Sequence, residues 1–163
     1  MSVRHAKPND AARIAEINII SWEDTYRGLM PDEIIDNRKL NAERILHYKE
    51  KIEEGKNTVL VYENEQGIIT GYLWAGKARD NDIKLFDELY AFYVDPKYQG
   101  NGYGTKLINK FKTIVKDKHF YLYMLKNNKT HDFYVKVGGV EMKDYTKTMQ
   151  IGNSKIEEVL YKF

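Results

Sequence analysis

The chain lacks cysteine altogether. This absence excludes disulfide bonds, thiolate zinc sites and a cysteine nucleophile. No apolar run approaches the roughly 20 residues that a membrane-spanning helix needs, and the initial MSVRHAKPND has no apolar core of the kind found in signal peptides. We therefore expect a cytoplasmic protein that does not act at a membrane.

The chain also has little net charge, +2, but that charge is unevenly distributed. Residues 1–96 hold 13 Lys and Arg against 18 Asp and Glu, whereas residues 97–147 hold 11 lysines against 4 acids. The basic segment favours a polyanionic partner, although lysines on a solvated surface give the same pattern. A nucleic-acid binder would interleave aromatic and basic side chains, and no such patch is evident. We expect no nucleic-acid partner.

The chain is rich in apolar and aromatic residues that can pack in a core. Apolar residues make up 42% of it and aromatic residues 13%, a composition typical of globular proteins and not of disordered ones. A length of 163 residues suits one domain with its own core. We therefore expect a single domain that spans residues 1–163.

Hydrophobic periodicity and turn residues predict strands and helices in a mixed order. Strands are expected at 2–7, 58–62, 68–75, 88–94, 119–125, 140–151 and 155–161. Helices are expected from 11 toward 22, and at 32–36, 42–54, 102–115 and 127–137. The strand at 88–94, the helix after it and the strand at 119–125 form a right-handed βαβ unit, so these two strands should be parallel.

The segment ELYAFYVDP is the clearest strand signal. Its residues alternate strictly, which places Glu88, Tyr90, Phe92 and Val94 on one face, and Pro96 ends the strand.

A glycine-rich stretch, YQGNGYGTKL, follows that strand and opens the next helix. A P-loop needs Gly-Lys-Ser/Thr, but the order here is Gly104-Thr105-Lys106. A dinucleotide fingerprint fails as well, because its third glycine would be Thr105. Unshielded N–H groups at a helix start still attract phosphate or pyrophosphate, whereas three glycines by themselves are equally typical of a flexible turn.

The surrounding residues favour the phosphate interpretation. YVDPKYQGNGYGTKL is a strand that leads through Gln99, Gly102 and Gly104 into a helix. This pattern resembles the acetyl-coenzyme A signature of the GNAT family of N-acetyltransferases, Gln/Arg-x-x-Gly-x-Gly/Ala.

Two further stretches extend the resemblance. NNKTHDFYVKVGG is similar to the family's next motif, with Asn127, Phe133 and Tyr134 in the matching places. SWEDTYRGLMP is similar to the helix and loop that cover the acceptor site in many members. One departure is Gly138-Gly139, where many members have Gly-Phe, and it leaves the local packing open.

The resemblance implies an α/β fold of the α+β kind, with three layers. Its sheet is mixed and mostly antiparallel, has about six or seven strands, is splayed at a central parallel pair and is flanked by helices. The pantetheine arm would lie in the gap beside Phe92, Tyr93 and Val94, where the Val94 N–H would hold the acetyl carbonyl and its developing negative charge.

The resemblance also implies where the rest of acetyl-coenzyme A binds. The pyrophosphate would rest on the loop that follows Gln99, and the residues expected to bind it are Gly100, Asn101, Gly102, Tyr103, Gly104 and Thr105. Lys97 or Lys106 would reach the phosphates. Asn127 would bind the pantetheine amide region, and the alternative for Asn127 is a helix N-cap.

Two residues are candidates for catalysis. Tyr134 matches the tyrosine acid of the family, which assists the leaving thiolate; the alternative is a tyrosine that only packs. Glu88 is the candidate base for the amine, about 20 Å along the strand from Val94 and so acting through water, and the alternative is a solvated or paired carboxylate.

The acceptor site is expected on the first long helix. Trp22 and Tyr26 lie four residues apart on one helix face, with acids such as Glu23 beside them, which would suit a cationic amine; a buried core stripe explains Trp22 equally well. His131 is interpreted as a helix-surface residue, and no ligand cluster predicts a metal.

These observations predict an N-acetyltransferase that uses acetyl-coenzyme A as cosubstrate, without a metal. The acceptor would be a primary amine of a small molecule, attacking directly in a ternary complex. A non-catalytic module that binds or senses acyl-coenzyme A is the alternative. A homodimer is possible, as it is common in the family.

Overall fold

A computed structural model describes residues 2–80, 83, 87–116 and 119–163. In chain order the elements are β1 (Ser2–His5), η1 (Pro8–Asp10), α1 (Ala11–Tyr26), α2 (Asp32–Asp36), α3 (Ala42–Glu53), β2 (Thr58–Glu63), β3 (Ile69–Lys77), β4 (Asp87–Val94), η3 (Pro96–Tyr98), α4 (Tyr103–Val115), β5 (Phe120–Leu125), α5 (His131–Lys136), β6 (Val140–Ile151) and β7 (Ser154–Lys162). The order of strands and helices is the one that the periodicity predicts.

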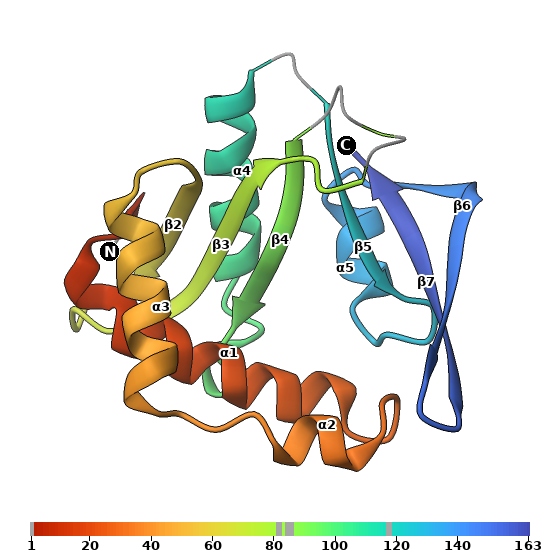
Figure 1. The fold of residues 1–163 in the computed structure, drawn as a ribbon. Coiled ribbons are helices and arrows are strands. Elements are labelled where there is room, and N and C mark those ends of the chain that lie inside the picture. Colours follow the sequence, from red (N-terminus) through yellow and green to blue (C-terminus); the bar gives the residue numbers. More distant parts are fainter. Residues whose placement is uncertain (1, 81–82, 84–86, 117–118) are drawn as a thin grey trace.

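The seven strands form one sheet in the order β1-β2-β3-β4-β5-β7-β6 (Figure 1). Every neighbouring pair is antiparallel except β4 and β5, which are parallel and are joined through α4. The predicted mixed, mostly antiparallel sheet with a central parallel pair is therefore confirmed.

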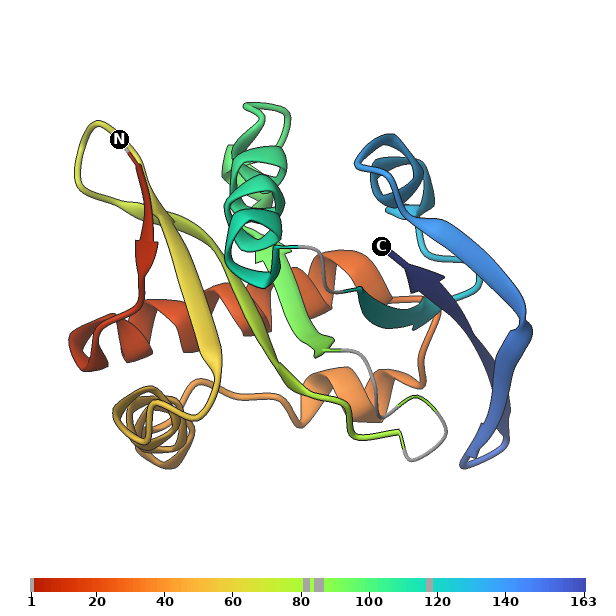
Figure 2. The same ribbon diagram turned by 90° about the horizontal axis from the view of Figure 1, so that it is seen from above.

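Helices cover both faces of the sheet, as the view from above shows (Figure 2). Helices α1, α2 and α3 lie on one face, and α4 and α5 lie on the other. Strand β2 shows why both faces need cover: Leu60 and Tyr62 pack into the core under α4, whereas Val59 and Val61 pack into the core under α1 and α3. Because side chains of a strand alternate between faces, this strand is apolar on both sides.

The parallel pair β4–β5 separates soon after it starts. Only Asp87 and Glu88 of β4 have register partners in β5, namely Phe120 and Tyr121. Beyond Glu88 the two strands diverge, and the sheet opens into a gap that widens toward their carboxyl ends (Figure 1). The predicted splay is confirmed.

A β-bulge interrupts the strand that the sequence predicts most clearly. In the register with β3, Ala75 is opposite Leu89 and Trp74 is opposite Ala91, so Tyr90 has no partner. Leu89 and Phe92 consequently share the core under α4. The strict alternation expected for this strand is wrong, because an inserted residue shifts the facing of everything after it. Glu88 precedes the bulge and faces away from α4, opposite to Phe92.

The segment after β5 also differs from the prediction. The expected helix at 127–137 begins only at His131. The buried side chain of Asn128 accepts hydrogen bonds from the backbone N–H and the hydroxyl of Thr130, at 2.9 and 2.8 Å. An Asn side chain that bonds two residues ahead stabilises a turn in place of a helical turn. Asn127 is therefore not an N-cap.

The packing of Phe163 explains why residue 139 is a glycine. A Cβ at Gly139 would lie 2.7 Å from Cζ of Phe163 and 2.9 Å from the backbone oxygen of Tyr134. The Phe163 ring stacks on Phe120 with centroids 4.7 Å apart. An aromatic ring thus packs against this glycine, but it comes from the residue after β7.

None of the described helices is long and apolar enough to cross a bilayer.

Candidate active site

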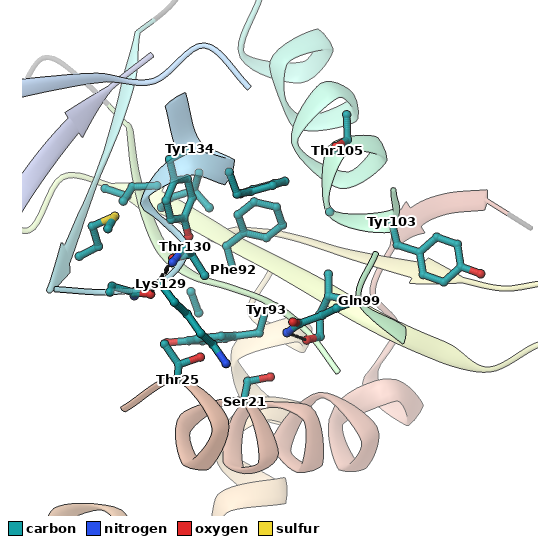
Figure 3. A pocket seen from close by; sticks show the side chains of 18 of the residues that line it. Ser21, Thr25, Phe92, Tyr93, Gln99, Tyr103, Thr105, Lys129, Thr130 and Tyr134 are labelled. Atoms are coloured by element: carbon teal, nitrogen blue, oxygen red, sulfur yellow. Dashed lines mark hydrogen bonds between the residues drawn. The ribbon is translucent and has the colours of Figure 1, made fainter. Parts of the chain in front are cut away.

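A cavity of about 520 Å³ fills the gap between β4 and β5. Its wall is built from α1, β4, the loop from Tyr98 to Thr105, β5, the segment that leads into α5 and α5 itself. Figure 3 shows the side chains of this wall, with Ser21 and Thr25 rising from α1 toward Tyr93 and with Phe92 and Tyr134 on the opposite side. The cavity therefore lies where the sheet opens.

The backbone of β4 presents free polar groups to this gap. In an antiparallel pair, the N–H groups of successive residues point alternately toward and away from the partner strand. The Asp95 N–H donates to the backbone oxygen of Thr70 in β3, at 2.9 Å. The N–H of Val94 therefore points the other way, toward the side where β4 has lost its partner β5.

The glycine loop leaves a second set of backbone donors free. Gly100 and Gly102 have φ of 81° and 74°, a conformation that only glycine adopts without strain. Gly102 is the N-cap of α4 and has no side-chain cap, and the first intrahelical donor is Lys106, which bonds Gly102 at 3.1 Å. The N–H groups of Tyr103, Gly104 and Thr105 are thus left for a ligand, at the positive end of the helix dipole.

Side chains in the loop hold its backbone in place. The amide of Gln99 donates to the Val94 oxygen at 3.0 Å, which ties the loop to the end of β4. The amide of Asn101 donates to the oxygens of Tyr98 and Gln99, at 3.0 and 3.3 Å. Asn101 is not part of the cavity wall, so its contact with the cosubstrate stays a prediction.

Gly104 is required for a close contact between α4 and α5. A Cβ there would lie 3.2 Å from Cζ of Phe133. Phe133 in turn packs against Phe92 and Tyr134, with ring centroids 5.6 and 5.4 Å away. These contacts join the two halves of the sheet and seat Tyr134 in the cavity wall.

Tyr134 is buried, and burial raises the pKa of its phenol, with Tyr26 adding to the rise. Its hydroxyl makes no hydrogen bond with the part of the chain that the structure describes. The phenol therefore stays protonated at neutral pH and keeps a donor for a ligand.

The two asparagines of the second motif lie in different places. Asn128 lines the cavity, whereas Asn127 is exposed and lines a smaller hollow beside Leu29 and Lys155. Sequence reasoning overlooked Asn128, because the helix start was placed too early.

The two aromatic residues expected at the acceptor site also lie in different places. Tyr26 lines the cavity, and its hydroxyl lies 3.3 Å from that of Tyr93. Trp22 lies outside the cavity wall, with the guanidinium of Arg38 stacked 3.6 Å over its ring. Glu23 is exposed and is bound by Arg27 at 2.6 Å. The acids expected beside the aromatics are thus engaged elsewhere.

Sequence reasoning missed two polar residues of α1 that face the cavity. Ser21 and Thr25 are four residues apart, so they share a helix face, and both are buried. The Oγ of Ser21 has no hydrogen-bond partner within the described residues. In the sequence, the available signal was a pair of hydroxyl residues four positions apart on a helix face that is mostly apolar.

Glu88 is buried and engaged by its surroundings. Its carboxylate accepts from the backbone N–H and Nε of Arg79 at 2.8 and 3.0 Å, from Nη2 at 2.5 Å, and from the Tyr121 hydroxyl at 3.1 Å. These four donors match the roughly four lone-pair sites of a carboxylate. Glu88 is not part of the cavity wall.

The lysines expected to reach the phosphates also lie outside the wall. Lys106 donates to the Tyr62 hydroxyl at 3.1 Å and lies over the stacked rings of Tyr62 and Tyr103, whose centroids are 4.3 Å apart. Lys97 does not line the cavity either. Any contact they make with a cosubstrate would be at its outer end.

The comparison with known proteins identifies the family. Residues 55–138 match the model of the acetyltransferase (GNAT) domain, which is more than half of the chain. The chain belongs to the GNAT family. As a member, it is an acyltransferase, an N-acetyltransferase that uses acetyl-coenzyme A as its cosubstrate. The resemblance seen in the motifs is thereby confirmed.

The sequence identity between this chain and individual GNAT relatives is low. An uncharacterized N-acetyltransferase, YuaI of Bacillus subtilis, is 27% identical over 141 residues, which cover 82% of this chain and 77% of YuaI. The L-amino acid N-acyltransferase MnaT of Escherichia coli is 32% identical over 110 residues, 68% of this chain and 60% of MnaT. A Salmonella typhimurium acetyltransferase, yncA, solved with acetyl-coenzyme A, has the same fold: TM-score 0.72, 21% identity, 99% of this chain and 92% of that one.

Proposed function

We propose that this GNAT enzyme transfers the acetyl group of acetyl-coenzyme A to a primary amine of a small molecule, by direct attack in a ternary complex. The observation that carries the proposal is the cavity in the sheet gap, which opens onto the free N–H groups of α4 at one end and onto α1 at the other. Such a cavity can receive the cosubstrate and an acceptor together.

The cosubstrate would be held mainly by backbone. Its pyrophosphate fits the N-terminus of α4, and its pantetheine amides fit the unpaired edge of β4 along Phe92 and Tyr93. Asn128 is the side chain placed to replace Asn127 as the partner of the pantetheine arm. The proposed position of the pyrophosphate also suits its charge, because anionic phosphates would lie at the positive end of the α4 dipole.

In the reaction, the lone pair of the amine nitrogen forms a bond with the thioester carbonyl carbon. Negative charge develops on the carbonyl oxygen, and the Val94 N–H points to the side from which it can stabilise that charge. The carbon–sulfur bond then breaks and releases the thiolate of coenzyme A. The Tyr134 hydroxyl donates a hydrogen bond to the departing sulfur; because its pKa is raised above that of a thiol, it stays protonated, and the thiolate takes its proton from water.

The proton of the amine leaves through water. Among the described residues, no carboxylate or imidazole lines the cavity. Glu88 is the base predicted from the sequence, but its carboxylate already accepts four hydrogen bonds and lies outside the cavity wall. Glu158 on β7 is half-buried and has no ion pair with any described residue; burial raises its pKa, and its charge adds to the rise in the pKa of Tyr26. We propose Glu158 as the second candidate for the final proton acceptor.

A small acceptor follows from the size of the cavity and from MnaT, the relative named for L-amino acids. The test is release of coenzyme A thiol from acetyl-coenzyme A in the presence of a panel of amines and amino acids. Saturable release with at least one acceptor, and an acetylated product by mass spectrometry, would support the proposal. If acetyl-coenzyme A binds in calorimetry but no acceptor of a broad panel is turned over, the sensing module becomes the better interpretation.

A further inference from the structure

Arg38 is a half-buried cation without an anionic partner. It follows α2 and reaches back to α1, where Nη2 donates to Oδ1 of Asn18 at 2.7 Å and the guanidinium lies over Trp22. No carboxylate pairs with it in the described part of the chain, and its buried Nε has no hydrogen-bond partner there. Only one of its five N–H donors bonds another of the described residues.

Such an arrangement is costly without a ligand. A guanidinium taken out of water loses solvation that an anion normally offsets. Burial lowers the pKa of Arg38, and the positive charge of Arg44 lowers that pKa further. The structure therefore keeps an uncompensated positive charge here.

This charge lies just behind the cavity wall on the side of α1. Burial raises the pKa of the Tyr26 phenol, the charge of Glu158 adds to that rise, and the charge of Arg38 acts against it, so Tyr26 is within the electrostatic reach of both charges. Ser21 lies between Asn18 and Trp22 along α1, the two residues that hold Arg38, and Figure 3 shows its side chain directed into the cavity.

The charges of the wall itself have the same sign. Its described residues include two lysines, Lys136 and Lys129, the second of which is paired with Asp24 of α1 at 2.6 Å, and neither Asp nor Glu. A polyamine would find no carboxylate in contact with it here, whereas an acceptor with an anionic group would meet a favourable field.

We propose that the acceptor is an amino acid whose carboxylate binds against α1. Ser21 donates a hydrogen bond to that carboxylate, and Arg38 stabilises its charge from behind Tyr26 and Tyr93. Ser21 is then a binding residue and Arg38 a positioning residue. The inference rests on the proposed function, and it narrows the acceptor from any small primary amine to one that carries a carboxylate.

The experiment compares each amino acid with the amine that lacks only its carboxylate: L-leucine with isoamylamine, and L-phenylalanine with phenethylamine. We expect higher kcat/KM for the amino acid of each pair. Arg38→Met should raise KM for the amino acid about tenfold, with little change in kcat and none for the matching amine. Arg38→Lys should restore most of the loss, because it keeps the charge. Ser21→Ala should also raise KM for the amino acid alone.

Lys39→Met is the matched control, because it removes one positive charge from the exposed neighbour of Arg38. It should leave both substrates unaffected. Equal turnover of amino acid and amine, or an equal effect of Arg38→Met on both, would overturn the subsite while leaving acetyl transfer intact. If nothing is turned over, titration of L-leucine and isoamylamine against the enzyme with coenzyme A decides: selective binding of L-leucine supports the subsite, and equal or absent binding refutes it.

Discussion

Tyr134 shows what a single side chain contributes at the edge of a cavity. The ring is held by Phe92 and Phe133, while its hydroxyl is left without a partner in the described structure. This hydroxyl is accessible from the cavity, so a ligand atom that accepts its hydrogen bond would replace water there. The sequence predicts this residue from its spacing to Phe133, but only the packing explains why its proton is available.

We expect Tyr134→Phe to lower kcat by about 10²-fold, because it removes the donor for the departing sulfur. The binding of acetyl-coenzyme A, measured by calorimetry, should change little since the ring is retained. The melting temperature should stay close to that of the parent. An unchanged kcat would reduce Tyr134 to a packing residue.

The two candidate bases differ in how fully their oxygens are used. Glu88 holds four donors, whereas Glu158 has no hydrogen bond from any described side chain. We therefore expect Glu158→Gln to lower kcat/KM more than Glu88→Gln does. Arg79→Met is the control for Glu88, because it breaks the same ion pair but keeps the carboxylate. If Glu88→Gln alone is inactive while Arg79→Met is active, Glu88 is the base.

Glu158 should also affect stability in a pH-dependent way. Burial raises its pKa, so the folded state holds this proton to higher pH than the unfolded chain, whose Glu titrates near pKa ~4.3. Its ionised form is therefore destabilising, and the effect appears as pH rises through the folded pKa. We expect Glu158→Gln to raise the free energy of unfolding by less than about 1 kcal/mol at pH 8 and to leave it unchanged at pH 4. Urea unfolding at both pH values measures it, and an equal effect at both would contradict the assignment.

At the scale of elements, the glycine loop and α4 form a unit that short-range chemistry explains. Gly100 and Gly102 adopt left-handed conformations, and Gln99 ties the loop to Val94. All of these residues lie within a few positions of one another, which is why a motif in the sequence predicts the loop. Gly139 is the opposite case, because its need for glycine comes from Phe163, which is distant in sequence.

Gly102 has a matched control elsewhere in the chain. Gly67, in the turn between β2 and β3, has the same φ of 74°, and a Cβ would meet nothing within 4 Å at either glycine. Gly102→Val and Gly67→Val should therefore cost a similar roughly 1–2 kcal/mol of stability from backbone strain. Only Gly102→Val should weaken coenzyme A binding, by more than tenfold in calorimetry. Equal affinity in both variants would make the segment a turn without a binding role.

For the whole molecule, the two halves of the sheet are joined along β4 and β5 by two residue pairs. Acetyl-coenzyme A in the gap would add contacts to both halves, from Phe92 on one side to Tyr134 on the other. Binding to the folded state alone stabilises it by mass action, about 2.7 kcal/mol at a ligand concentration 100-fold above Kd.

We therefore expect saturating acetyl-coenzyme A to raise the melting temperature by roughly 5–10 °C. Hydrogen exchange should slow at the amides of Phe92 and Val94, which have no partner strand on the side of the gap. Exchange in β1 and β2 should change little and serves as the internal control. Protection confined to regions away from the gap would show that the cosubstrate binds elsewhere.

The sequence by itself determined the order of strands and helices, the parallel pair around α4, and the glycine loop that precedes α4. These features depend on periodicity and on turn residues within short segments, so residues that are neighbours in the sequence suffice to predict them. The tertiary structure decided the face of the sheet on which Glu88 lies and its ion pair with Arg79. It also decided that Asn128 and Ser21 line the cavity, and that Arg38 has no anionic partner among the described residues. Each of these depends on which distant segments pack together, and on a bulge at Tyr90 that one strand alone does not encode.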